Sequence, residues 1–322
     1  MLALLIALFL LAIGTGLLLI GADWFLDGAG DLARALGLSA LVIGVLLAGL
    51  EPEEMLTTAI ASARGAPALA VGTVVGTNIT IVTAALGLSA LIFPMTISRS
   101  VRRQALIATL VSIIPIVLLF LGAVTRLEGV FLLIVFVGYT LFLFQTDQEA
   151  MKRMMEGEDD DDNDDDENQP RRRPQLSLKP ILLTFGGLTA MALGGPATVE
   201  GALRLTQVIG QSQGVVGATI VSLGTGAEMI ALGVSAARNK RSDILVGGIL
   251  GSFAYNLLVT LGLAATIHSL PVAPHLLFVA LPIMGAVHLT LLALIWYGKI
   301  PRVMGGLLVI VYLAYLITIV LA

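Results

Sequence analysis

The chain has no cysteine and few charged side chains. The absence of cysteine from 322 residues excludes disulfides, thiolate metal sites and cysteine nucleophiles. Only 12% of the residues are charged, whereas 57% are hydrophobic and the mean hydropathy is +0.98. The three histidines, His268, His275 and His288, do not have the spacing of metal ligands. This composition does not suit a water-soluble surface and predicts a membrane protein.

The acidic residues are concentrated in one segment. Twelve of the 22 lie between Asp147 and Glu167. Such a charge block cannot bury apolar surface, so we predict a disordered linker. It is a solvated connection or, alternatively, a low-affinity collector of cytoplasmic Ca²⁺. The predicted organisation is a first transmembrane half over 1–146, an acidic loop over 147–179 and a second transmembrane half over 180–322.

Long apolar segments predict an all-α polytopic membrane protein. A bilayer core about 30 Å thick needs about 20 mostly apolar residues per helix. Ten segments meet this requirement: 2–33, 38–63, 67–95, 104–123, 128–146, 180–207, 211–237, 244–268, 274–297 and 302–321. The first lacks a basic flank and a small-residue cleavage site, so we expect a retained helix rather than a signal peptide.

The distribution of lysine and arginine orients these helices. The breaks after the odd-numbered segments contain 15 of the 18 basic residues, and the even-numbered breaks contain only Arg64, Arg126 and Arg204. Basic residues favour cytoplasmic loops. The odd breaks, including the acidic loop, are therefore predicted to be cytoplasmic, with both termini outside.

The two halves repeat each other at nearly constant offsets. Asp27-Gly28-Ala29 matches Glu200-Gly201-Ala202 at 173 positions, and Gly76-Thr77 matches Gly251-Ser252 at 175. Each half has five predicted spans, so the second copy must enter the membrane upside down. Inverted repeats of this kind are typical of secondary transporters with a site near the midplane. We also expect Asp27 and Glu200 to lie at the cytoplasmic ends of their helices, solvated at the membrane interface.

Carboxylates occur in the middle of the second span of each half. Glu51, Glu53 and Glu54 surround Pro52, and Glu228 follows Gly226. A carboxylate at the bilayer centre is costly unless it meets a polar cavity or partner, so it indicates a functional site. Glu54 and Glu228 occupy matching places and are the predicted cation ligands. Glu51 and Glu53 are further ligands, proton carriers or residues facing an aqueous vestibule.

Other oxygen-bearing side chains lie in the same spans. They are Thr77, Asn78, Thr225, Ser252 and Asn256. Carboxylate, amide, hydroxyl and backbone carbonyl groups together form an all-oxygen ligand set. Hard cations such as Ca²⁺ and Na⁺ prefer this set, whereas soft metals prefer thiolate or imidazole.

These motifs resemble the cation/calcium exchanger superfamily, whose members exchange Ca²⁺ for Na⁺ or H⁺. The resemblance covers the region from Gly21-Ala22-Asp23-Trp24 to Gly37-Leu38-Ser39 and the second and third spans of each half. It implies ten helices with a cytoplasmic loop between the fifth and sixth.

The chain departs from the family pattern at several positions. Gly49 and Glu54 keep the six-residue spacing of the sodium-coupled branch, but Leu50 and Glu51 stand where that branch has Thr and Ser. Ile81 replaces a side-chain oxygen. The second copy is similar to the proton-coupled branch, with Gly251-Ser252 followed by Asn256. Glu51 and Glu53 would serve either as proton carriers or as replacement sodium ligands.

The resulting prediction is a secondary antiporter that exchanges Ca²⁺ for Na⁺, or alternatively for H⁺, by alternating access. A cation channel is a less favoured alternative, since oxygen-lined midplane sites can also conduct. An intramembrane hydrolase is less favoured still, because no nucleophile or zinc motif is present. We expect no cofactor beyond the transported cations, no nucleic acid and no obligate protein partner. The expected location is a prokaryotic plasma membrane.

Overall fold

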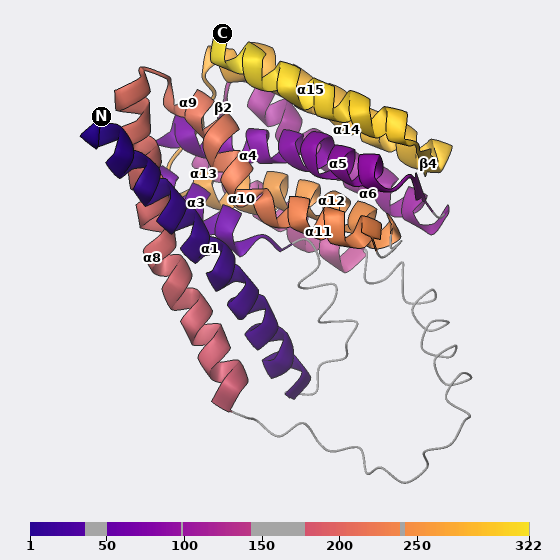
Figure 1. Cartoon of the computed structure of the whole chain (residues 1–322), viewed down its shortest axis with the longest axis horizontal. Helices are drawn as coiled ribbons and strands as arrows, with labels where there is room; N and C mark the ends of the chain where they lie inside the picture. Colours follow the sequence, from indigo (N-terminus) through magenta and orange to yellow (C-terminus); the bar gives the residue numbers. More distant parts are fainter. Residues whose placement is uncertain (36–49, 98, 143–177, 239–241, 322) are drawn as a thin grey trace.

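The computed structural model describes residues 1–35, 50–97, 99–142, 178–238 and 242–321. These residues form a membrane protein built almost entirely of helices (Figure 1). Within them, six helices are long and apolar enough to cross a membrane, or seven if one bent pair is a single span. The acidic segment and most of the loop over 147–179 lie outside the described residues. The first part of the predicted span 38–63, up to residue 49, also lies outside them.

Two long helices, α1 (Leu2–Ala35) and α8 (Leu178–Ile209), pack side by side and extend obliquely from the other helices (Figure 1). Their contact consists of small residues repeating every seven positions. These are Gly14, Gly21 and Gly28 on α1 and Gly187, Gly194 and Gly201 on α8. A Cβ at Gly28 would lie 2.5 Å from the backbone nitrogen of Thr184. Glycine is therefore required here because the two backbones touch.

The first half continues with α3 (Pro52–Ala63) and α4 (Pro67–Thr80). A π-helical turn, η1 (Ile81–Ala85), joins α4 to α5 (Leu86–Ile92). Prolines begin both α3 and α4, where a missing N–H costs no helical hydrogen bond. The continuous span Pro67–Ile92 is buried over residues 69–87 and forms the centre of the molecule.

The second half repeats part of this order of elements. The bent span comprises α9 (Gln213–Val216), η2 (Gly217–Val221), α10 (Ser222–Thr225) and α11 (Ala227–Arg238). It is followed by α12 (Ser242–Tyr255), η3 (Asn256–Thr260) and α13 (Leu261–Ile267). Here α11, α12, η3 and α13 repeat the order of α3, α4, η1 and α5. The π-helical turns η1 and η3 begin 175 positions apart, and so do α3 and α11.

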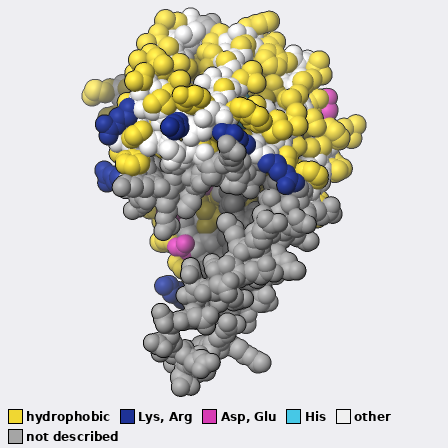
Figure 2. Space-filling model, turned by 90° about the vertical axis from the view of Figure 1, so that its right-hand side faces the viewer, with side chains coloured by type: hydrophobic (Ala, Val, Ile, Leu, Met, Phe, Trp, Pro, Cys, Tyr) yellow, Lys and Arg dark blue, Asp and Glu magenta, His cyan; other side chains and the backbone are white. Residues whose placement is uncertain are grey.

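The remaining helices surround this centre. They are α6 (Arg99–Phe120), a helix over 126–142, η4 (Leu276–Ala280) with α14 (Leu281–Tyr297), and α15 (Arg302–Leu321). Their outer sides present many exposed aliphatic and aromatic side chains. Figure 2 shows this hydrophobic surface, with a row of Lys and Arg side chains along its lower border. This arrangement is typical of a lipid-facing surface ending at the polar headgroups.

Two short antiparallel sheets join the halves. β1 (Met95–Thr96) pairs with β4 (Lys299–Ile300), and β2 (Ala123–Val124) pairs with β3 (Leu270–Pro271). Each sheet thus takes one strand from residues before the acidic segment and one from residues after it. The first half and the second half are consequently tied together at two places.

The prediction that Asp27 and Glu200 share the cytoplasmic side was wrong. Glu200 lies near the end of α8 opposite Lys179, where it pairs with Arg64 at 3.4 Å and Arg204 at 2.7 Å. Asp27 lies near the opposite end of the α1–α8 pair, because these helices are antiparallel. The two residues therefore lie on opposite sides of the molecule, and at most one of them can be cytoplasmic.

Candidate cation site

The candidate site is built around two helix breaks. In the first half, Glu51 precedes α3 and Pro52 is its first residue, so the chain cannot continue a helix through this point. In the second half, Gly226 separates α10 from α11, and the two segments meet at an angle of 42°. Breaks in membrane helices are tolerated where they are buried in protein or line a cavity.

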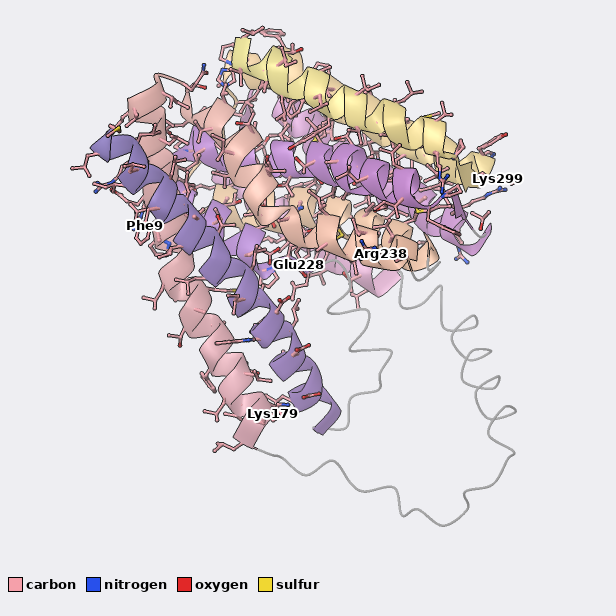
Figure 3. The ribbon with its side chains drawn as sticks, in the orientation of Figure 1. Phe9, Lys179, Glu228, Arg238 and Lys299 are labelled. Atoms are coloured by element: carbon pink, nitrogen blue, oxygen red, sulfur yellow. The ribbon has the colours of Figure 1, made fainter. Side chains whose placement is uncertain are left out.

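Four glutamates gather at these breaks. Glu51, Glu53 and Glu54 are 6%, 1% and 0% exposed. Glu228, in the first turn of α11, is half-buried and lies beside Glu53. Figure 3 places Glu228 in the central part of the molecule, away from Lys179, Arg238 and Lys299. Buried carboxylates close together require cations, protons or strong hydrogen bonds.

The carboxylate of Glu51 is bound by the other half of the chain. Nδ2 of Asn256 donates a hydrogen bond of 2.7 Å to Oε2 of Glu51. Ser252, one turn earlier on α12, also lies next to this carboxylate. Oδ1 of Asn256 accepts a 3.3 Å hydrogen bond from Thr260 in the same π-helical turn. The turn η3 thereby orients Asn256 toward the first helix break.

Two hydroxyls meet across the halves beside Glu54. Oγ1 of Thr77 on α4 and Oγ1 of Thr225 on α10 are 3.4 Å apart, and both side chains are buried. Both threonines lie next to the Glu54 carboxylate. Neither carboxylate oxygen of Glu54 has a hydrogen-bond partner among the described residues. The two threonine hydroxyls and the two carboxylate oxygens of Glu54 are therefore buried with few hydrogen bonds to the described residues.

Further buried oxygens at the breaks also lack a partner within the part of the chain that the structure describes. They are Oε2 of Glu53, Oδ1 of Asn78 and Oγ of Ser252. The amide nitrogen of Asn78 donates to the carbonyl of Val74 at 2.9 Å, which fixes the orientation of the amide. Unsatisfied buried oxygens are uncommon because each costs free energy. A hard cation would satisfy several of them at once.

The described residues contain no cluster of three or more histidine, aspartate or glutamate side chains arranged to hold a metal ion. The chemistry of this site differs from that of a structural metal centre, since its oxygens come from carboxylates, hydroxyls and amides of both halves. Mixed sets of this kind suit cations that are bound and released.

Eight of the nine predicted site residues lie at or beside the two breaks, and the ninth, Asn78, is buried next to Thr77 on α4. One pairing differs from expectation. Glu53, rather than Glu54, is the neighbour of Glu228. The separation of Glu53 and Glu228 is 175 positions, which is also the separation of the two helix starts. Gly49, which anchored the predicted pairing, lies outside the described residues.

Sequence reasoning missed Tyr255. Its phenol lies beside the carboxylate cluster and donates a 3.4 Å hydrogen bond to Sδ of Met55. Its position immediately before Asn256 was the available indication, because neighbouring residues of a π-helical turn can both approach a site. An aromatic residue within an apolar segment is instead usually part of the core.

Comparison with known proteins identifies relatives over almost the whole chain. The family model described as sodium/calcium exchanger protein matches residues 6–145 and 179–321. Inner membrane protein YrbG of Escherichia coli is 31% identical over 82% of this chain and 80% of its own length. Sodium/calcium exchanger MaX1 of Methanosarcina acetivorans is 30% identical, with 96% of this chain and 97% of that protein covered.

A solved structure of the sodium-calcium exchanger NCX_Mj has a similar fold. The sequences are 25% identical, the TM-score is 0.64, and the match covers 97% of this chain and 98% of the other. The two long helices, the bent span and the oxygen-lined centre therefore occur in a chain whose family consists of membrane exchangers rather than enzymes. The chain belongs to the sodium/calcium exchanger protein family of cation antiporters.

Proposed function

We propose that the protein exchanges Ca²⁺ for Na⁺ across a membrane by alternating access at the candidate cation site. This proposal rests on one observation: the two halves bring oxygen-bearing side chains together. Glu53 lies beside Glu228, and Oγ1 of Thr77 is 3.4 Å from Oγ1 of Thr225. A cation bound there would contact both halves. Its release would free them to move relative to each other.

The proposed ligands are the oxygen-bearing side chains at the two breaks. Glu53 and Glu228 would hold the divalent cation from opposite halves, together with Glu54 and the hydroxyls beside it. Glu51, Asn78, Ser252 and Asn256 would complete the set. Ca²⁺ accepts six to eight oxygens in flexible geometry, and Na⁺ would compete for the same oxygens.

The proposed topology is ten helices in two inverted five-helix repeats. The equal 175-residue separations of α3 from α11 and of η1 from η3 support it. The two sheets support it as well. β1 and β3 also begin 175 positions apart, and each pairs with a strand of the other half, β1 with β4 and β3 with β2. The first repeat would comprise residues 1–146 and the second 180–322, joined by the acidic segment.

The proposed orientation places both termini outside and the acidic loop in the cytoplasm of a prokaryotic cell. Lys179, Arg238 and Lys299 lie at the ends of their elements in Figure 3, and a row of basic side chains borders the hydrophobic surface in Figure 2. Cytoplasmic enrichment of basic residues supports this orientation in the plasma membrane.

Exchange of Ca²⁺ against H⁺ is the alternative function. It is favoured by the number of buried carboxylates, since Glu51 and Glu53 stand beside Glu54 without a lysine or arginine partner among the described residues. Protons could neutralise carboxylates that two or three sodium ions would otherwise neutralise. A channel is a further alternative, and it would conduct cations without any counter-ion.

Calcium uptake into proteoliposomes distinguishes these functions. The purified protein is reconstituted, a sodium or pH gradient is imposed, and the membrane voltage is clamped with an ionophore. Uptake driven by the sodium gradient alone is the expected result. Uptake driven by the pH gradient alone would establish proton exchange, and uptake without either gradient would establish a channel.

A further inference from the structure

The phenol of Tyr255 is buried against the candidate site but has a poor hydrogen-bond acceptor. The residue is 7% exposed, and its hydroxyl donates to Sδ of Met55 at 3.4 Å. The ring packs edge-on against Phe136, with ring centroids 5.7 Å apart and planes at 84°. A thioether sulfur is a weak acceptor. The ring therefore has one aromatic neighbour, whereas the hydroxyl is only weakly held.

Stronger acceptors, the carboxylates of the site, are linked to the neighbours of Tyr255 and Met55 in the chain. Tyr255 directly precedes Asn256, whose amide is 2.7 Å from Glu51, and Met55 follows Glu54 in the chain. Glu51 and Glu53 are the charged groups that act on the phenol. A hydrogen bond from a hydroxyl to a carboxylate is about twice as strong as one between neutral groups.

The equivalent position in the other half has a different arrangement. At a separation of 175 positions, Thr80 corresponds to Tyr255, and at 176 positions Tyr312 corresponds to Phe136. Phe136–Tyr139 and Tyr312–Tyr315 both have ring centroids 6.4 Å apart, which supports this correspondence. Tyr312 lies beside Thr80 instead of the carboxylates. Tyr312 is thus a buried phenol that lies away from the glutamate cluster, whereas the phenol of Tyr255 adjoins it.

We infer that the hydroxyl of Tyr255 competes with the cation for the carboxylates of Glu51 and Glu53. When the cation is bound, the hydroxyl donates to Met55. When the cation leaves, rotation of the C–O bond and a small ring shift transfer the same hydrogen bond to a carboxylate, without proton transfer. Tyr255 is thus an affinity-setting residue that favours release. This inference rests on the proposed function, because it takes these carboxylates as cation ligands.

Substitution of the two partners gives effects of opposite sign. Tyr255→Phe removes the competing donor, so the dissociation constant for Ca²⁺ should fall about tenfold. Met55→Leu removes the sulfur that accepts the hydrogen bond of Tyr255. The hydroxyl then donates more often to the carboxylates, so the dissociation constant for Ca²⁺ should rise roughly threefold. In the Tyr255→Phe background, Met55→Leu should have no further effect, because the donor is absent.

The measurement is calorimetric titration of the full-length protein in detergent with calcium chloride, in buffer containing choline instead of sodium. Tyr312→Phe is the matched control and should bind Ca²⁺ like the wild type. Size-exclusion elution and thermal unfolding verify that every variant is folded. A purely structural role for Tyr255 would predict weaker binding or lower stability in both single variants.

The outcomes separate the inference from the function on which it rests. Weaker or unchanged binding by folded Tyr255→Phe protein would overturn the competing role, and so would an effect of Met55→Leu that persists without the phenol. Absence of calcium binding to the wild type would overturn the proposed function itself, and this inference with it.

Discussion

Asn256 and Glu51 form the shortest side-chain hydrogen bond between the two halves at the site, at 2.7 Å from Nδ2 to Oε2. Both residues are buried. Asn256 begins the π-helical turn η3, and Glu51 precedes the proline that begins α3. The contact therefore links a helix distortion in one half to the helix break in the other. Any movement that opens the site between these elements must disrupt it.

A double-mutant cycle on this pair tests its contribution. Asn256→Leu leaves a buried carboxylate without its amide donor, and Glu51→Leu leaves the amide without its acceptor. Hydrogen bonds to charged groups contribute roughly 1.5–3 kcal/mol, so we expect a coupling free energy of that size. Unfolding in mixed micelles with increasing sodium dodecyl sulfate measures it. A coupling near zero would mean that Glu51 finds another donor as readily.

The second prediction concerns the pair formed by Glu53 and Glu228. Replacing either with Gln removes a charge but keeps its shape, so we expect at least about a hundredfold loss of calcium exchange with little change in folding. Counter-gradient uptake into proteoliposomes measures the loss. Glu200→Gln is the matched control, because it removes an exposed carboxylate paired with Arg64 and Arg204. Exposed pairs contribute about 0–1 kcal/mol, so its transport should remain normal.

Glu54→Gln is the informative comparison for that experiment. Glu54 adjoins Thr77 and Thr225, whereas Glu53 adjoins Glu228. If Glu53 is the symmetric partner of Glu228, the Glu54 variant should retain more exchange than the Glu53 variant. Full exchange by Glu53→Gln protein combined with complete loss in Glu54→Gln protein would restore the pairing expected from residue spacing.

Much of the candidate site was predictable because charged and polar residues are rare in these spans. Glu51, Glu228 and Asn256 stood out on composition alone, and the structure brings them to one centre. The pairing across the halves was less predictable. Glu54 preserves a spacing from Gly49, but the helices begin at Pro52 and Ala227, and these starts align Glu53 with Glu228. Backbone geometry, rather than residue identity, determines which carboxylate lies beside Glu228.

The contact between the two long helices was predicted only in part. Gly28 and Gly201 were matched as repeat equivalents, but a sequence match does not indicate which helix a glycine faces. In the structure, Gly28 contacts Thr184, and Gly201 contacts Ala7 and Leu11. The seven-residue spacing becomes meaningful once the antiparallel packing is known, because only then do both sets of glycines lie along one line.

A third prediction tests that contact with two glycines of one helix. A Cβ at Gly14 would collide with Thr198 on α8, whereas a Cβ at Gly16 would have nothing within 4 Å. Gly14→Ala should therefore destabilise the protein by about 1–3 kcal/mol through overpacking. Gly16→Ala should leave stability unchanged or increase it by roughly 0.5–1 kcal/mol, because alanine favours the helix. The free energy of unfolding of each variant is measured in mixed micelles. Equal changes for Gly14→Ala and Gly16→Ala would contradict the packing described.

The last prediction concerns a position at which the two halves differ in chemistry. Ile81 begins η1 as Asn256 begins η3, and the two are 175 positions apart. Ile81 is completely buried. An asparagine there would place an amide oxygen at the equivalent position of the first half. If sodium shares the site, this added oxygen should strengthen its binding.

We expect Ile81→Asn to lower the sodium concentration that half-displaces Ca²⁺ by about threefold to tenfold, as one further polar contact of roughly 1 kcal/mol would do. The competition is measured by calcium titration of purified protein at increasing sodium chloride, with choline chloride maintaining ionic strength. Ile79→Asn is the matched control, since Ile79 is equally buried but lies in α4 before the π-helical turn. It should lower stability without changing the competition. Unchanged sodium competition in folded Ile81→Asn protein, together with displacement by acid, would instead favour protons as the counter-ion.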